Sequence, residues 1–228
     1  KLKIISFGIK NAANLKLMEM KKEKFSTLLL INYNGKILKF FIKKNLENYI
    51  YNILSSLSVI SIYFNLESLK KSFFNDYKFP EGRGDLKLIN FRKKNIYLID
   101  ESYNSNPLSL KFALNKLNNF NKKSKRKLIL LGDMLELGKY SKKLHSEAAQ
   151  HINDTKIDRV YVYGKEVIET FNKIRPQKRG KILNSKKDIL NFIRNDIKDG
   201  EYLMIKGSNS TGLNKISQSL KIGKLNAF

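Results

Sequence analysis

The sequence predicts an α/β protein whose larger, C-terminal part has a mostly parallel, doubly wound sheet. From Asp85 onward, short apolar runs alternate with segments of helical periodicity, and such alternation is typical of parallel sheets covered by helices. Three of the apolar runs lead into polar segments, at residues 100–106, 132–138 and 206–212. The first 76 residues instead show strand patterns followed by a long helical pattern, so a different and incomplete domain is expected there.

The opening residues have the pattern of β structure. Strands are expected at residues 4–8, 26–31 and 36–42. Asn34-Gly35 separates the last two strands and indicates a tight hairpin, because both positions tolerate positive φ. Three strands without a covering layer are marginal, so the segment is interpreted as the trailing part of a domain that begins upstream of Lys1.

Two helices are expected next, at residues 47–63 and 66–74, the second capped by Asn65. Asn48 and Asn52 lie four residues apart on the first helix, so they share one face and could bind the hydrogen-bonding edge of a purine. The alternative is that both are ordinary exposed residues, because asparagine is common on helix surfaces.

The boundary between two domains is expected within residues 75–84, where one proline and two glycines interrupt both periodicities. It divides the chain into residues 1–76 and 77–228. Arg83 lies between the two glycines, in a chain with only 7 arginines among its 45 basic residues. Glycine lets the backbone approach a ligand, and a guanidinium binds phosphate with a fork that an ammonium lacks. A flexible turn is the alternative interpretation.

The second part of the chain alternates strands and helices. Strands are expected at residues 86–91, 95–99, 127–131, 160–163, 181–183 and 202–205. Helices are expected at residues 107–120, after a cap at Ser141, at 165–174 and 186–197, and up to Leu220, with a frayed tail at 221–228. Asn106 is the expected N-cap of the first of these helices, and Pro107 its first residue.

The three polar segments should meet, because the carboxyl ends of parallel strands lie along one edge of a sheet, where α/β proteins bind ligands. The first segment supplies carboxylates and amides, and the second supplies Asp133 and Glu136. The third supplies Lys206 and backbone N–H groups before a helix, which suits an anion. Together they could hold a zwitterion, with the acids facing its ammonium and Lys206 its carboxylate. A polar turn without a ligand is the alternative.

Composition excludes several classes of protein. The formal net charge is +25, but it comes mainly from lysines spread through every segment, whereas nucleic-acid readers concentrate arginine and aromatic residues on one face. No nucleic-acid partner is therefore expected.

Cysteine is absent, which removes disulfides and thiolate metal sites. No apolar run approaches the roughly 20 residues that span a bilayer. His145 and His151 are expected to pack or to lie at the surface rather than to bind a metal.

The Mur ligases are the family that these motifs resemble, from about residue 5 to residue 220. The resemblance is carried by Asp100-Glu101-Ser102-Tyr103-Asn104-Ser105-Asn106-Pro107, Leu131-Gly132-Asp133-Met134-Leu135-Glu136-Leu137-Gly138, His145, Tyr163-Gly164-Lys165 and Lys206-Gly207-Ser208. Within the family, the motifs look most like those of the branch that adds D-alanyl-D-alanine to UDP-N-acetylmuramoyl-tripeptide.

The resemblance implies that residues 1–76 end a central ATP-binding domain and that residues 77–228 form the C-terminal, Rossmann-like domain. The family uses ATP to activate the tripeptide as an acyl phosphate, which the dipeptide amine attacks, and ADP and phosphate leave. The implied cofactors are ATP and Mg²⁺, and the implied partners are the UDP-linked tripeptide and D-alanyl-D-alanine. A cytoplasmic monomer is expected. A related ligase with another amino acceptor, or a basic module that binds nucleic acid or another anion, is the alternative.

The resemblance also implies roles for single residues. It assigns ATP binding to Asn48, Asn52, Arg83 (near the phosphates), Asp100 and Glu101 (at the ribose). It assigns substrate binding to Ser102, Tyr103, Asn104, Asn106, Asp133, Glu136, Lys206 and Ser208. It assigns no catalytic residue and no metal ligand to this chain: the family's phosphate loop, carbamylated lysine and magnesium ligands are expected upstream of Lys1. The 228-residue chain alone is therefore expected to lack ligase activity.

The sequence departs from the family pattern at two places. The family's adenine-contacting helix usually opens with His-Asn-x-x-Asn, where this chain has Glu47-Asn48-Tyr49-Ile50-Tyr51-Asn52. Asn209 stands where arginine is common, so an anion contact of the family is not expected at that position.

Overall fold

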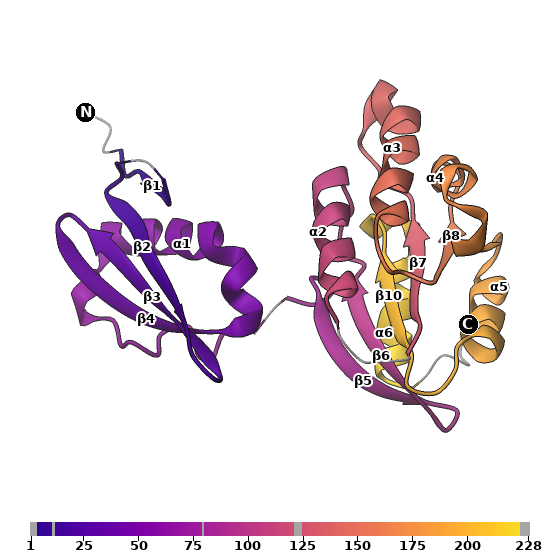
Figure 1. Cartoon of the computed structure of the whole chain (residues 1–228), viewed down its shortest axis with the longest axis horizontal. Helices are drawn as coiled ribbons and strands as arrows, with labels where there is room; N and C mark the ends of the chain where they lie inside the picture. The colour runs from indigo at the N-terminus through magenta and orange to yellow at the C-terminus, as the bar shows by residue number, and fades with distance from the viewer. Residues whose placement is uncertain (1–3, 11, 79, 121–124, 224–228) are drawn as a thin grey trace. The chain divides into compact units, whose positions relative to one another are not determined.

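The computed structural model of the chain, shown in Figure 1, describes residues 4–10, 12–78, 80–120 and 125–223. The chain divides into two compact units, Lys1–Lys78 and Phe79–Phe228. This division falls two residues after the boundary expected from the sequence. Each unit has its own sheet.

The first unit contains a four-stranded sheet with the order β1-β2-β3-β4. Its strands are β1 (Phe7–Gly8), β2 (Leu15–Lys22), β3 (Ser26–Tyr33) and β4 (Lys36–Lys43). The hairpin between β3 and β4 is confirmed, because Asn34 and Gly35 have φ values of 48° and 89°. The sequence did not predict β2, since a register shift after Leu17 interrupts its alternation of buried and exposed residues.

The predicted helix at residues 47–63 is two helices. A 3₁₀ helix, η1 (Lys44–Tyr49), leads into α1 (Ile50–Tyr63). The predicted helix at residues 66–74 is wrong beyond the 3₁₀ turn η2 (Leu66–Ser68). The rest of the predicted helix, residues 69–74, forms turns, and it contacts β4 through a hydrogen bond of 2.8 Å from the N–H of Phe41 to the carbonyl of Lys71. The cap is confirmed, because Asn65 accepts a hydrogen bond from the N–H of Glu67 at 3.0 Å.

The second unit contains a six-stranded sheet with the order β5-β6-β10-β7-β8-β9. Its strands are β5 (Asp85–Phe91), β6 (Lys94–Glu101), β7 (Lys127–Gly132), β8 (Arg159–Tyr163), β9 (Arg179–Ile182) and β10 (Tyr202–Lys206). Only the pairing of the edge strand β5 with β6 is antiparallel, and the other pairings are parallel. The predicted α/β class with a mostly parallel sheet is therefore confirmed.

Helices cover both faces of this sheet (Figure 1). Residues of α2 (Pro107–Asn118), α3 (Ser141–Asn153) and α4 (Val167–Lys173) share one core with Ile129, Leu131 and Met204 of the strands. Residues of α5 (Lys186–Asn191), of the π-helix η5 (Phe192–Asp196) and of α6 (Leu213–Lys221) share the other core with Leu128, Leu130 and Ile205. Successive strand residues thus point into opposite cores, as expected of a covered sheet.

Two of the expected helix ends are wrong. Ser141 is the first residue of α3 rather than its cap, and its hydroxyl donates to Glu166 at 2.9 Å. Lys221 is not frayed: it ends α6, its side chain is 6% exposed, and its ammonium pairs with Asp85 and Asp100. Residues 224–228 of the expected frayed tail lie outside the described residues.

Along the described part of the chain, every helix is too short or too polar to cross a membrane.

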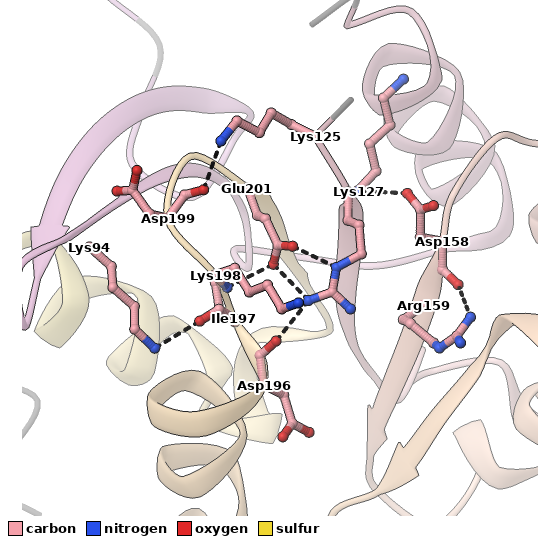
Figure 2. A network of polar contacts seen from close by, with 11 residues as sticks. Lys94, Lys125, Lys127, Asp158, Arg159, Asp196, Ile197, Lys198, Asp199 and Glu201 are labelled. Atoms are coloured by element: carbon pink, nitrogen blue, oxygen red, sulfur yellow. Dashed lines mark hydrogen bonds and ion pairs between the residues drawn. The ribbon is translucent and has the colours of Figure 1, made fainter. Parts of the chain in front are cut away.

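A polar network lies at the amino ends of β7 and β10 (Figure 2). The guanidinium of Arg126 donates to both carboxylate oxygens of Glu201, at 2.5 and 3.0 Å, and to the carbonyl of Asp196 at 2.9 Å. Glu201 also accepts from the N–H of Lys198 at 2.8 Å. Because Arg126 and Glu201 immediately precede their strands, this bidentate pair fixes how β10 enters the sheet.

Candidate functional site at the carboxyl edge of the sheet

The three polar segments follow three neighbouring strands. Lys206, the last residue of β10, lies opposite Glu101 of β6 on one side and opposite Leu131 of β7 on the other. The loops after these strands are therefore adjacent along one edge, which we call the rim. It consists of residues 102–106 after β6, 207–212 after β10 and 133–137 after β7. The predicted convergence of the three loops is confirmed.

Ser208 joins the three loops. Its N–H donates to the carbonyl of Asp133 at 3.0 Å, and its hydroxyl accepts from the N–H of Leu135 at 2.9 Å. The same hydroxyl lies 3.4 Å from the carbonyl of Ser105. Since Ser208 is buried, these bonds are shielded from water and hold the rim as one structure.

Two opposite charges lie beneath the rim. Lys206 is 1% exposed, and its ammonium donates to the carbonyl of Asn104 at 3.0 Å. Burial lowers the pKa of Lys206, although the negative charge of Glu101 opposes this effect. Burial raises the pKa of Glu101, which the charges of Lys206 and Lys116 oppose. Buried charged groups with shifted pKa values are concentrated at functional sites.

Asp100 points away from Glu101, because successive strand residues face opposite sides of a sheet. Its carboxylate contacts the ammonium of Lys221 at 2.6 Å and accepts from the N–H and the hydroxyl of Ser102, at 3.1 and 2.5 Å. Burial would raise the pKa of Asp100, but hydrogen bonds from Lys221 and Ser102 outweigh burial and lower it. Both carboxylate oxygens of Asp100 thus have partners inside the domain.

The second rim loop is held by Asp133 and His145. The carboxylate of Asp133 accepts from the N–H groups of Val167 and Lys165, at 2.8 and 3.1 Å, and so binds the start of α4. The Nε2 atom of the buried His145 accepts from the N–H of Met134 at 3.0 Å. His145 therefore has a packing role, as expected. Glu136 is exposed and has a φ of 64°.

Tyr103, Asn104 and Asn106 of the first rim loop are exposed, and so is Arg83, which lies beside this loop. The guanidinium of Arg83 lies over the ring of Tyr103, 4.4 Å from its centroid. Asn106 is the N-cap of α2, as predicted, and its side chain accepts from the N–H of Ser109 at 2.8 Å. Asn104 accepts from the N–H of Ser105 at 2.7 Å.

Two supporting lysines were missed by the sequence analysis. The ammonium of Lys116, on α2, donates to the carbonyl of Gly84 at 2.6 Å and lies near Glu101. The second is Lys221, which pairs with Asp100. No pattern in the sequence could have found them, since both pair with residues far away along the chain.

Asn48 and Asn52 belong to the first unit, and both are exposed. Asn48 lies in the 3₁₀ helix η1 and Asn52 in α1. The expectation of a single α-helix through both residues is therefore wrong, because the helix type changes after Tyr49. Their role in ATP binding stays a prediction.

A pocket of about 320 Å³ lies at the edge of the second unit. It is lined by Lys181, Ile182, Leu183, Asn184, Asp188, Asn191, Phe192, Asn195 and Asp196. None of the predicted site residues lines this pocket. Among the residues that the structure describes, no three His, Asp or Glu side chains are grouped so that they could hold a metal ion.

The fold and the rim define an α/β domain with a polar edge at the carboxyl ends of its parallel strands. A comparison with family models matches residues 87–209 to the family described as "Mur ligase, glutamate ligase domain". The match covers more than half of the chain, and the chain belongs to the Mur ligase family.

Two curated relatives bear the same name, UDP-N-acetylmuramoyl-tripeptide--D-alanyl-D-alanine ligase. The Bacillus subtilis protein is 32% identical over 126 residues, which are 54% of this chain and 27% of that protein. The Rickettsia prowazekii protein is 28% identical over 213 residues, which are 93% of this chain and 46% of that protein. The chain thus spans less than half the length of these relatives.

Solved structures have the same fold. The MurF ligase from Thermotoga maritima, in complex with ADP, has a TM-score of 0.71 at 20% identity, over 97% of this chain and 49% of that chain. MurF from Acinetobacter baumannii has a TM-score of 0.73 at 19% identity, over 96% of this chain and 47% of that chain.

Proposed function

We propose that this chain supplies the part of an ATP-dependent amide ligase that binds the amino acceptor and contributes to the nucleotide site. The reaction is the addition of D-alanyl-D-alanine to UDP-N-acetylmuramoyl-tripeptide in peptidoglycan precursor synthesis. The main support is the convergence of three rim loops around Ser208, in a chain whose curated relatives bear that ligase's name. In this proposal residues 1–76 end an ATP-binding domain and residues 77–228 form the C-terminal domain.

The proposed chemistry has two steps. The tripeptide carboxylate takes the γ-phosphoryl group of ATP, which breaks the anhydride bond and releases ADP. The dipeptide amine then attacks the carbonyl carbon of the acyl phosphate, phosphate leaves, and the nitrogen loses a proton as the amide forms. Both steps require cations near the phosphates and an amine held in line with the carbonyl.

In this proposal the second unit contacts the nucleotide through Arg83 and Glu101, with Asp100 as a further candidate. Asn48 and Asn52 are separate candidates for ATP binding within the first unit. Arg83 is exposed and offers N–H donors to a phosphate. Glu101 offers carboxylate oxygens to the hydroxyls of a ribose. Asp100 supports this strand end from the opposite face of the sheet, since both of its oxygens have partners.

The acceptor side consists, in this proposal, of residues that differ in exposure. The exposed ones can touch a ligand directly: Tyr103, Asn104, Asn106 and Glu136. The remaining ones position the loops from within: Ser102, Asp133, Lys206 and Ser208. The ammonium of Lys206 is a positive charge beneath the first rim loop, which favours the carboxylate of a dipeptide.

Mg²⁺ does not fit the described residues as a metal site, because they group no three acidic or imidazole ligands. No step is therefore assigned to a metal ion held by this chain. A cytoplasmic location is part of the proposal, because ATP and UDP-linked precursors are cytoplasmic compounds. The product would serve cell-wall synthesis, and hence cell shape and division.

A coupled assay of ADP release tests the proposal. The protein is assayed at the length that its reading frame encodes and, in parallel, as the 228-residue chain. We expect ADP release from the longer protein only when both the UDP-linked tripeptide and D-alanyl-D-alanine are present. Equal rates with single amino acids as acceptors would identify a related ligase instead. Turnover by the 228-residue chain alone would contradict the expected need for a further ATP-binding part.

A further inference from the structure

The segment Gly82-Arg83-Gly84 runs beside the first rim loop and extends the pairing of β5 with β6. The N–H of Gly84 donates to the carbonyl of Asp100 at 2.6 Å, and the N–H of Tyr103 donates to the carbonyl of Gly82 at 3.1 Å. Gly82 has a φ of 74°, and a Cβ there would lie 2.9 Å from the backbone nitrogen of Tyr103. The close approach thus requires glycine, and it fixes the backbone of Arg83 at the rim.

The side chains of Arg83 and Tyr103 are in contact above this backbone. The guanidinium carbon lies 4.4 Å from the centroid of the ring, within the range of a cation–π interaction. Both side chains are exposed, and the tyrosine is 48% exposed. Among the described residues, Arg83 forms no ion pair with a carboxylate. A cation–π contact uses no N–H group, so the donors of the guanidinium remain available for an oxyanion.

We propose that Tyr103 is a positioning residue, whose ring holds the guanidinium of Arg83 at the rim in the place where it binds the phosphate chain of a nucleotide. This inference rests on the proposed function and deepens it. It replaces the direct contact with the acceptor that the sequence analysis and the proposed function give to Tyr103, because Tyr103 here acts through Arg83. The ligand class is a polyphosphate, which matches the fork of a guanidinium better than a single ammonium does.

The contact itself is tested by NMR on the ¹⁵N-labelled 228-residue chain. With only 7 arginines, the Nε–Hε signals are few enough to assign. We expect the Arg83 signal to carry a ring-current shift that persists in Tyr103→Phe and is lost in Tyr103→Leu. Phe25→Leu is the matched control, because Phe25 is also exposed and lies under a cation, with Lys24 at 5.2 Å from its ring. An Arg83 signal that is the same in wild type and in Tyr103→Leu would overturn the proposal.

The consequence for binding is tested with inorganic tripolyphosphate as the probe. We expect Tyr103→Leu to weaken its binding about two- to fivefold, as loss of an exposed cation–π contact implies, and Tyr103→Phe to restore it. In the background Arg83→Gln, Tyr103→Leu should have no further effect. An equal loss in that background would show that Tyr103 contacts the ligand itself, and it would overturn the positioning role.

The outcomes separate this inference from the proposed function. No response of the Arg83 signal to tripolyphosphate in wild type would overturn the inference, since Arg83 would then not be an anion-binding residue. A normal Arg83 response, together with no ADP release that depends on D-alanyl-D-alanine in the longer protein, would overturn the proposed function and leave the positioning role supported.

Discussion

Lys221 is expected to be a major source of stability in the second unit. Its ammonium lies 2.6 Å from Asp100 and 2.7 Å from Asp85, and the side chains of Lys221 and Asp100 are 6% and 2% exposed. Replacing it in Lys221→Met keeps the apolar stem and removes the charge. The carboxylate of Asp100 would then remain buried without its cation.

The expected cost follows from this geometry. Removing one partner of a buried ion pair costs about 3–5 kcal/mol, because the other charge remains unpaired. Asp85 is 26% exposed and can be hydrated, so we expect the lower end, about 3 kcal/mol of unfolding free energy. In a domain of this size, that loss lowers Tm by about 6–12 °C. The double variant Lys221→Met/Asp100→Asn should recover at least half of the loss, since it leaves no unpaired charge at Asp100.

The pH dependence has a defined sign. The pKa of Asp100 is lowered, because its hydrogen bonds outweigh the effect of burial. Its contribution to folding stability is therefore present above the unfolded pKa of about 3.9 and is lost as pH falls through the folded pKa. The pKa of Lys221 is raised, because its hydrogen bonds to Asp100 and Asp85 outweigh the effect of burial. Its contribution to folding stability is therefore present below the unfolded pKa of about 10.4 and is lost as pH rises through the folded pKa. The difference between wild type and Lys221→Met should therefore be largest between these two pH values.

Urea unfolding followed by circular dichroism measures this difference. Lys215→Met is the matched control, because Lys215 lies on the same helix and is exposed, and it should change stability by less than about 0.5 kcal/mol. If Lys221→Met were no more destabilising than Lys215→Met, the helix end would be frayed and the buried ion pair would be wrong.

Three further predictions concern the second unit. Gly84→Ala should lose more stability than Gly212→Ala, although both replace a glycine with φ near 80°. The reason is that a Cβ at Gly84 would lie 2.5 Å from the carboxylate of Glu101, whereas a Cβ at Gly212 would meet no atom within 4 Å. Thermal unfolding of the two variants checks this. Lys93→Gly should add about 0.5–1 kcal/mol in urea unfolding, since Lys93 has a φ of 64° in the turn between β5 and β6, and unchanged or lower stability would contradict this. Arg126→Lys should lower the free energy of unfolding by about 1–3 kcal/mol in the same assay, because an ammonium cannot form the bidentate pair at the amino end of β10. A loss below about 0.5 kcal/mol would show that the pair contributes little.

The parts of the fold that follow local rules could be predicted from the sequence. The hairpin at Asn34-Gly35 and the cap at Asn106 depend on residues next to each other in the chain. The convergence of the three rim loops also follows, because parallel strands end at the same edge. Their roles in binding remain predictions.

Other features depend on contacts between distant residues and could not be predicted. The strand β2 has a register shift that hides its alternation. Lys221 was expected to begin a frayed tail, but its partners are Asp85 and Asp100, more than a hundred residues earlier. Asp133 looked like a ligand-facing acid, yet both of its oxygens accept backbone hydrogen bonds from the start of α4. In each case the side chain's partner, rather than its own chemistry, decides its role.

The central claim is that the rim holds both the nucleotide and the amino acceptor. Its most direct test is a crystal structure of the protein, at the length that its reading frame encodes, with ADP and D-alanyl-D-alanine bound. We predict ribose hydroxyls within hydrogen-bond distance of the Glu101 carboxylate, and a dipeptide in contact with the loops at residues 102–106, 133–137 and 207–212. Either ligand bound instead in the pocket beside Asn184 and Asn191, or at the amino ends of the strands near Arg126, would contradict the claim.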